Sequence, residues 1–527
     1  MPPRTKILQA RSVKRVPLKG KISYLKKDSW LTLLVLAALL LALLQLLELS
    51  TLRILPGPLF GGDVYYHQGH IRSIYEGGSP FMSSHFLGEY EHYPWLSHLF
   101  AAVFSRLVGN TYLGHIYFPI IMLFMSVGLI YFATLRWLDS KATAAGITLL
   151  YVCVNLPLMY TPSSFAVFTS IPFVLYFLAK LDTTRDYIYG GVVLGLGSLT
   201  HPTPFLAGLL YVLLRLLFTL FSQYKRNSYR LGLQVWKTFR HTLIGTTITC
   251  VISIAIAMIY YGPLIIGYQL STLNNWQEYT QVISLQTLFQ AAWSLFQRMF
   301  FDYTTVAAGI ISLSALIAVL SSAVVKKEED LTKMQSFSLL VLVVGILGVL
   351  HPIFTQPLLG TSFGYYSFPR VLQTARITLA YAGIYLAYCL VSRKFLVTSA
   401  FSVLLIYTAI AGVEQAASGD WFSGAKKENQ FVEAYHTIGN QMLSTINRER
   451  STLTLHPEAG FALNAVTGLP VVYMRRTHAS PFVDVDQRYL DATLMLYGND
   501  SAHRSYLRGQ YQTGYIFVDP YGTRTIS

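Results

Sequence analysis

The sequence predicts an α-helical polytopic membrane protein of about eleven spanning helices, with a small extracytoplasmic α/β domain at its C-terminal end. Two features of composition support this prediction. Of the 527 residues, 53% are hydrophobic and only 12% are charged; with a mean hydropathy of +0.44, the chain lies outside the range of soluble proteins. Apolar runs long enough to cross a bilayer also recur along it. After residue 413 the composition returns to that of a small soluble domain.

A basic tail, residues 1–29, precedes the first apolar run. The whole chain carries 40 Lys and Arg against 25 Asp and Glu, a formal charge of +15, which in a soluble protein would suggest a nucleic-acid partner. Nine of these basic residues lie in the tail, where cytoplasmic retention and contact with anionic membrane lipids explain them. We therefore expect no nucleic-acid partner. We expect a multi-pass protein of the plasma membrane with a cytoplasmic N-terminus.

The transmembrane domain, residues 30–413, contains eleven candidate spans of suitable length. The segment 187–221 is broken by the sequence His201-Pro202-Thr203-Pro204, and we interpret it as a short helical hairpin, with one kinked element as the alternative. The candidates lie near residues 30–49, 113–135, 142–160, 162–180, 187–200, 203–221, 242–268, 304–324, 335–353, 374–391 and 395–413.

The distribution of basic residues predicts which loops are outside. Lys and Arg concentrate in alternate loops, as the positive-inside rule requires. With an odd number of spans, this pattern makes three parts of the chain extracytoplasmic. They are the first loop at 50–112, the late loop at 353–373 and the α/β domain at 414–527.

Asp63 lies just beyond the first predicted span, at the start of the first loop. Partial desolvation at the membrane boundary would raise the pKa of this carboxyl group and strengthen it as a proton acceptor. We therefore interpret Asp63 as a candidate general base. The alternative is a loop aspartate that is held by turn or cap hydrogen bonds.

Later in the same loop, Glu89, Glu91 and His92 are candidates for orienting a sugar or binding a divalent cation. A Glu-x-Glu-His cluster has no spacing that is diagnostic of a metal site, so a solvated loop is the favoured interpretation. We therefore predict no metal and no cofactor.

Three basic residues near the outer ends of spans are candidates for binding substrate. His201 lies where two apolar segments meet, and its alternative role is to satisfy backbone groups freed by the neighbouring prolines. The late loop contains Tyr366 and ends at Arg370, with Arg376 further along the next span. A guanidinium group suits a phosphate held at the membrane surface. For Arg376, snorkelling to lipid headgroups is the alternative.

The C-terminal domain also carries a dense group of charged residues between 475 and 491. We interpret this group as a structural ion-pair network, with binding of a polar ligand as the alternative. Its members are Arg475, Arg476, Asp484, Asp486, Arg488 and Asp491, together with the polar residues Thr477 and His478.

Together these features resemble the GT-C superfamily, integral membrane glycosyltransferases that use polyprenyl- or dolichyl-phosphate-linked sugar donors. Asp63 matches the first-loop carboxylate of that family, which in most members deprotonates the acceptor hydroxyl or helps to bind the acceptor. The pattern from Asp63 to His67, followed by His92-Tyr93-Pro94, is similar to many prokaryotic members. The resemblance therefore adds His67 to the candidate substrate-binding residues. It implies membrane lipids and a lipid-linked sugar as partners, with a glycan, lipid or protein as acceptor.

Departures from the family pattern narrow the expected activity. The oligosaccharyltransferase catalytic subunit has a Trp-Trp-Asp motif, which the sequence Gly419-Asp420-Trp421-Phe422 does not match, and its paired acidic residues are missing from 155–165. The resemblance therefore implies a distant relative of that subunit and of the protein mannosyltransferases, inverting and independent of metal. The rival hypothesis is a transporter or flippase of a lipid-linked or small polar substrate, which the broken hairpin favours.

Overall fold

The computed structural model describes eleven parts of the chain. They are residues 29–50, 62–156, 165–226, 233–269, 271–276, 282–321, 329–359, 368–418, 437, 441 and 446–518. Most of the predicted basic tail lies outside the described residues, as do Tyr366 and the sequence Gly419-Asp420-Trp421-Phe422.

Six helical stretches among the described residues are long and apolar enough to cross a membrane, so the chain is a multi-pass membrane protein. They are Ser29–Leu49, Thr111–Trp137, Pro202–Lys225, Phe239–Tyr268, Glu329–Leu358 and Lys394–Gln415.

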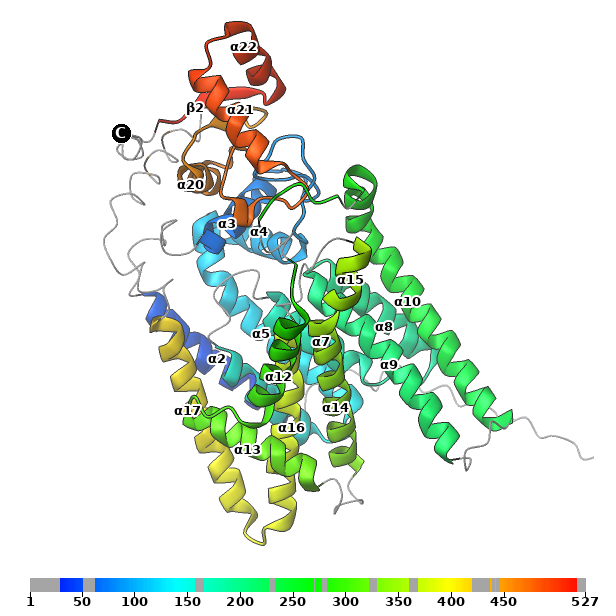
Figure 1. Cartoon of the computed structure of the whole chain (residues 1–527). Helices are drawn as coiled ribbons and strands as arrows, with labels where there is room; N and C mark the ends of the chain where they lie inside the picture. The colour runs from blue at the N-terminus through cyan, green and yellow to red at the C-terminus, as the bar shows by residue number, and fades with distance from the viewer. Residues whose placement is uncertain are drawn as a thin grey trace, which may run out of the picture.

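The six membrane-spanning stretches and the helices between them, apart from those of the first loop, form one bundle (Figure 1). They are α2 (Ser29–Leu49), α5 (Thr111–Trp137), α6 (Lys141–Asn155), the π-helix η3 (Phe165–Ser170), α7 (Ile171–Leu178), α8 (Thr184–Ser198), α9 (Pro202–Arg226), α10 (Leu233–Tyr268), α12 (Leu285–Phe300), α13 (Val306–Ser321), α14 (Glu329–Leu350), α15 (Pro352–Leu359), α16 (Pro369–Leu390) and α17 (Lys394–Ser418).

Each of the eleven predicted spans overlaps one of these helices. Four of the helices, α6, α7, α8 and α13, are 15, 8, 15 and 16 residues long, shorter than a crossing requires. The count of eleven spans therefore stays a prediction. The two-helix interpretation of segment 187–221 is confirmed, because α8 ends at Ser198 and α9 begins at Pro202.

Local sequence signals fix several helix ends. The Asn110 side chain accepts hydrogen bonds from the backbone N–H groups of Tyr112 and Leu113, which caps α5. Thr183 and Asp186 form a reciprocal capping box at the start of α8. These caps satisfy backbone donors that the first turn of a helix leaves without partners.

Close helix packing explains a glycine in α8. A Cβ atom on Gly195 would lie 2.6 Å from Cβ of Ile256 on α10. Such a contact is too short for any side chain, so only glycine lets the two helices approach this closely.

The elements outside the bundle come from both ends of the sequence and lie together above it in Figure 1. The first loop contributes α3 (Gly62–Tyr75) and α4 (Leu96–Val108). The C-terminal segment contributes β1 (Ser451–Leu453), α20 (Pro457–Thr467), the 3-10 helix η5 (Arg476–His478), α21 (Val485–Tyr497), α22 (Ser501–Gln510) and β2 (Thr513–Ile516).

In the C-terminal segment, β1 and β2 form a small parallel sheet that joins its beginning to its end. This segment shares a hydrophobic cluster with the first loop, because Tyr66 and Phe86 pack with Phe461 and its neighbours. The predicted domain boundary at residue 414 falls within α17, which runs on to Ser418. That boundary, and a separate α/β domain, stay predictions.

Candidate active site

Asp63 lies in the first turn of α3, where the positive end of the helix dipole favours a carboxylate. Its Oδ1 atom is 2.6 Å from Nε2 of His478 in η5, and its side chain is 75% exposed. The Thr477 hydroxyl lies 2.8 Å from the other ring nitrogen of His478. With that hydroxyl donating to Nδ1, Nε2 carries the hydrogen that it donates to Asp63.

The predicted rise in the pKa of Asp63 is wrong. The hydrogen bond from His478 lowers the pKa of this carboxyl group below 3.8, and burial opposes the shift only in part. Electrostatic interactions with His478, Arg475 and Arg370 lower the pKa further. Asp63 is therefore ionised at neutral pH, and its exposed oxygen is available to accept a proton.

Arg370 lies in the first turn of α16, with its side chain exposed. It makes no ion pair with any residue that the structure describes. The charge of Arg370 lowers the pKa of both Asp63 and His201. Asp63 and His201 therefore each lie within electrostatic range of Arg370.

His201 caps α9. Its Nδ1 atom accepts a hydrogen bond of 3.1 Å from the backbone N–H of Thr203. Burial, with a smaller contribution from Arg370, lowers the pKa of His201 to about 3. The alternative predicted for this histidine, that it satisfies backbone groups near the prolines, is confirmed. A role in substrate binding stays a prediction.

Arg376 has a partner within the protein. Its Nη1 atom is 2.9 Å from Oδ2 of Asp302, and its Nη2 atom donates to the carbonyl oxygen of Ala308 and to Oγ of Ser312, each at 3.1 Å. The pair lines a cavity of about 310 Å³. A phosphate-binding role for Arg376 stays a prediction, and its ion pair with Asp302 adds a structural role.

Glu89 connects three parts of the molecule. Its Oε2 atom accepts a hydrogen bond of 2.6 Å from the Tyr268 hydroxyl on α10, and its Oε1 atom is 2.7 Å from Nη2 of Arg488 on α21. The first loop is thereby tied to both the helix bundle and the C-terminal segment.

Glu91 is not in a solvated loop, so that interpretation is wrong. Its side chain is only 2% exposed. Oε1 accepts hydrogen bonds from the Tyr66 hydroxyl at 3.3 Å and from the Tyr93 backbone N–H at 2.8 Å. Oε2 lies 3.2 Å from Nδ1 of His70. Burial raises the pKa of Glu91 to about 8, because the hydrogen bonds that the carboxylate accepts offset only part of the loss of hydration.

His67 and His92 contact other buried side chains of the first loop. Nδ1 of His67 is 2.8 Å from Nε2 of His98, and Nε2 of His92 is 3.3 Å from the Tyr66 hydroxyl. Burial lowers the pKa of His92 to about 3, and that of His67 well below its usual value. Both are neutral at physiological pH, and their substrate-binding roles stay predictions.

The predicted ion-pair network of the C-terminal segment is confirmed in part: one ion pair joins two members of the predicted group, and two others reach partners outside it. Arg475 pairs with Glu458 and Arg476 with Asp486, while Arg488 reaches Glu89 in the first loop.

Sequence reasoning missed His70 and His85, and it placed His478 in the charged group of the C-terminal domain without predicting its contact with Asp63. A signal existed for His70, which follows Asp63 by seven residues, about two helical turns, and so shares a helix face with it. No local signal links His478 to Asp63, because the contact joins residues 415 positions apart.

No family model matches the chain. The uncharacterized protein MJ1080 of Methanocaldococcus jannaschii is 35% identical over 120 residues, which are 23% of this chain and 88% of that protein.

Two solved structures resemble the whole architecture. The archaeal oligosaccharyltransferase AglB from Archaeoglobus fulgidus, in complex with an inhibitory peptide and a dolichol-phosphate, has a TM-score of 0.51 at 14% identity, over 93% of this chain and 69% of that chain. ArnT from Cupriavidus metallidurans, bound to undecaprenyl phosphate, has a TM-score of 0.50 at 15% identity, over 90% and 92%. Both are GT-C glycosyltransferases. At this identity the likeness concerns the fold.

Proposed function

The chain belongs to the same family as the uncharacterized protein MJ1080 of Methanocaldococcus jannaschii, and because it has the GT-C fold that its sequence predicts, we propose that it is a membrane glycosyltransferase. It transfers a sugar from a polyprenyl- or dolichyl-phosphate donor to an acceptor hydroxyl on the extracytoplasmic side of the plasma membrane. The observation that carries this proposal is the ionised, exposed carboxylate of Asp63 within electrostatic range of Arg370.

In the proposed reaction, Asp63 accepts the proton of the acceptor hydroxyl as that oxygen attacks the anomeric carbon of the sugar. A new carbon–oxygen bond forms while the bond to the lipid phosphate breaks, and the phosphate leaves with the electron pair. One displacement of this kind inverts the anomeric centre. The exposure of Asp63 lets its proton pass to solvent before the next turnover.

Arg370 is proposed to hold the donor phosphate. Its charge is not taken up by an ion pair with any described residue, and it lies at the positive end of α16. An arginine at this place stabilises the negative charge that grows on the leaving phosphate. His201 and Tyr366 are proposed to assist on the donor side, and no divalent cation takes part in the transfer step.

The test is sugar transfer by the purified full-length protein in detergent, from a synthetic short-chain polyprenyl-phosphate sugar. EDTA is added together with the donor, and mass spectrometry detects glycosylated product or free sugar from slow donor hydrolysis. Turnover in EDTA supports the proposal. Tight binding of the lipid phosphate without any turnover would contradict it and favour the rival, a transporter or flippase.

His478→Ala is expected to move the acid limb of the activity profile to higher pH. The hydrogen bond from His478 lowers the pKa of Asp63, so the carboxylate persists until the pH falls through that lowered value. Without His478 the pKa returns toward 3.8, and activity is lost at a higher pH. Donor hydrolysis measured from pH 3 to 8 tests this, with His503→Ala, an exposed histidine on α22, as control. Superimposable acid limbs would contradict it.

A further inference from the structure

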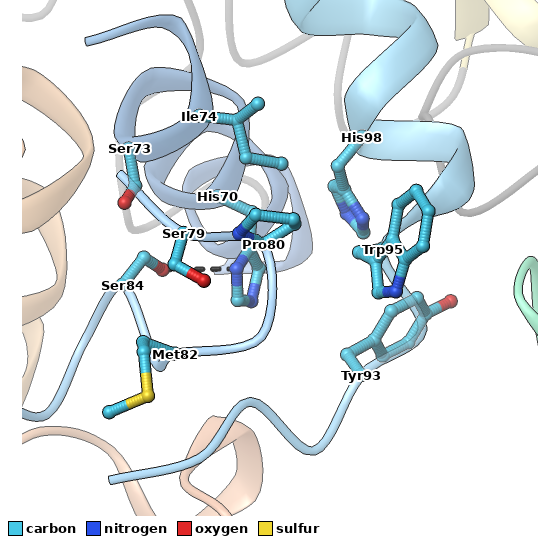
Figure 2. Close-up of a pocket in the computed structure, with 10 residues that line it drawn as sticks. All are labelled: His70, Ser73, Ile74, Ser79, Pro80, Met82, Ser84, Tyr93, Trp95 and His98. Atoms are coloured by element: carbon cyan, nitrogen blue, oxygen red, sulfur yellow. Dashed lines mark hydrogen bonds between the residues drawn. The ribbon is translucent and has the colours of Figure 1, made fainter. Parts of the chain in front are cut away.

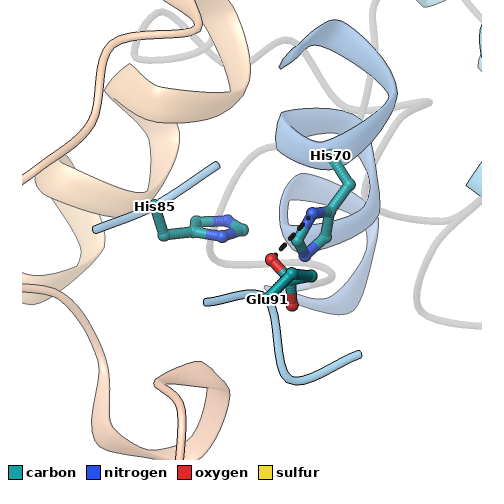
Figure 3. Close-up of side chains that lie close together, drawn as sticks. All are labelled: His70, His85 and Glu91. Carbon is teal, nitrogen blue, oxygen red and sulfur yellow. Dashed lines mark ion pairs between the residues drawn. The ribbon is translucent and has the colours of Figure 1, made fainter. Parts of the chain in front are cut away.

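Three buried side chains of the first loop converge at one point, as Figure 3 shows. His70 comes from α3, and His85 and Glu91 come from the loop that follows it. Each offers one ligand atom, and these atoms lie within 4.8 Å of one another. His70 is 5% exposed, and His85 and Glu91 are each 2% exposed.

Each of the three side chains has a buried polar atom that makes no hydrogen bond with a described residue. Nε2 of His70, Nε2 of His85 and Oε2 of Glu91 make no hydrogen bond with any residue that the structure describes, although Oε2 also lies 3.2 Å from Nδ1 of His70. Buried polar atoms are nearly always paired. Two unpaired imidazole nitrogens, in a cluster with a carboxylate whose contact is a histidine of the same cluster, therefore point to a ligand that bonds to all three side chains.

Ser84 contacts both imidazole rings and orients them. Oγ of Ser84 lies 3.1 Å from Nδ1 of His70 and 3.0 Å from Nδ1 of His85. Such a contact on one ring nitrogen sets the orientation of the other, which is the usual arrangement around metal-bound histidines.

We propose that His70, His85 and Glu91 bind one Zn²⁺ ion. Two imidazole nitrogens and one carboxylate oxygen are a donor set that zinc prefers in proteins. A cavity of about 10 Å³ adjoins the cluster on the side of His70 and is lined by His70 and Ser84, but not by His85 or Glu91 (Figure 2). Its size is at the lower limit for one water molecule, which supplies the fourth ligand.

The role of this zinc is structural. The site is enclosed, and Asp63 lies about two helical turns before His70 on the same helix. The ion ties α3 to the loop whose Glu89 contacts α10 and α21. It therefore fixes the helix that carries Asp63 without touching the reacting groups, and the proposal does not depend on the glycosyltransferase assignment.

Metal analysis of the purified full-length protein tests the site. Wild type is expected to retain about one zinc per chain after dialysis, and to lose it on prolonged incubation with 1,10-phenanthroline, with a fall in melting temperature that added Zn²⁺ reverses. His85→Gln and Glu91→Gln are expected to lack the zinc and its effect on melting. Ser84→Ala is expected to weaken zinc binding about 10- to 100-fold.

His115→Gln is the matched control. His115 is as deeply buried, but its Nδ1 atom bonds to Gln68 and it lies outside the cluster, so this variant is expected to keep its zinc. Equal zinc content in wild type and His85→Gln would overturn the proposal. Should the glutamine variants fail to fold, the test is made with metal-free wild-type protein alone. The proposal is overturned if added Zn²⁺ does not raise its melting temperature and added Co²⁺ gives no tetrahedral absorption spectrum.

Discussion

Asp63→Asn is expected to lower the rate of sugar transfer by about 10²- to 10⁴-fold, the range that a general base contributes. The asparagine oxygen can still accept the hydrogen bond from Nε2 of His478, so the local geometry is kept. The amide has no basicity with which to take the acceptor proton. Donor binding is expected to stay near the wild-type value, because the proposed phosphate contact is Arg370.

The measurement is single-turnover transfer at saturating donor, together with direct binding of the lipid-phosphate sugar. Asp486→Asn is the matched control, since it removes the same charge from an exposed carboxylate that pairs with Arg476. An exposed ion pair contributes at most about 1 kcal/mol to stability, so neither variant is expected to unfold. Wild-type turnover by Asp63→Asn would eliminate Asp63 as the base.

The helices could be predicted from sequence because bilayer length and hydropathy constrain them directly. The break between α8 and α9 could also be predicted, but for a different reason: Pro202 cannot continue a preceding helix. The number of crossings was harder to predict. Helices such as α6 and α13 are apolar along their length yet short, and sequence hydropathy does not distinguish a short buried helix from a crossing.

The site was predictable only in part, for a physical reason. Asp63 and Arg370 stand out because each is a charge at the end of an apolar segment. The group that tunes Asp63 lies in η5, and no local pattern links residues brought together by tertiary packing. Glu89 and Glu91 look alike in sequence, and in a regular strand residues two apart would share one face. In this loop they do not: Glu89 reaches Arg488, and Glu91 enters the histidine cluster.

The C-terminal segment therefore contributes directly to the candidate active site. His478 bonds to Asp63, Arg488 pairs with Glu89, and the Asn464 side chain donates to the Ser84 carbonyl oxygen at 2.6 Å. These contacts connect the segment to the N-terminal end of α3, to the outer part of the loop and to the residue behind the proposed zinc ligands. The first loop depends on this segment for its conformation.

Arg376→Met is expected to lower the free energy of unfolding by about 3 kcal/mol, the lower end of the range for removing one partner of a buried ion pair. Arg376 is 8% exposed, and its loss leaves the half-buried Asp302 without its cation. The effect falls at the lower end because Asp302 keeps hydrogen bonds from the backbone N–H and the hydroxyl of Thr304.

A double-mutant cycle separates the contribution of the Arg376–Asp302 ion pair to stability from the contribution of side-chain packing. Asp302→Asn in the Arg376→Met background removes the uncompensated charge, so the double variant is expected to recover much of the lost stability. Lys333→Met is the control, because its partners Asp139 and Glu329 are largely exposed and its loss costs at most about 1 kcal/mol. Unfolding is followed by SDS titration in one detergent. Additive losses in the cycle, or equal losses for Arg376→Met and Lys333→Met, would contradict a structural role for the pair, and the phosphate-binding interpretation of Arg376 would then be the stronger one.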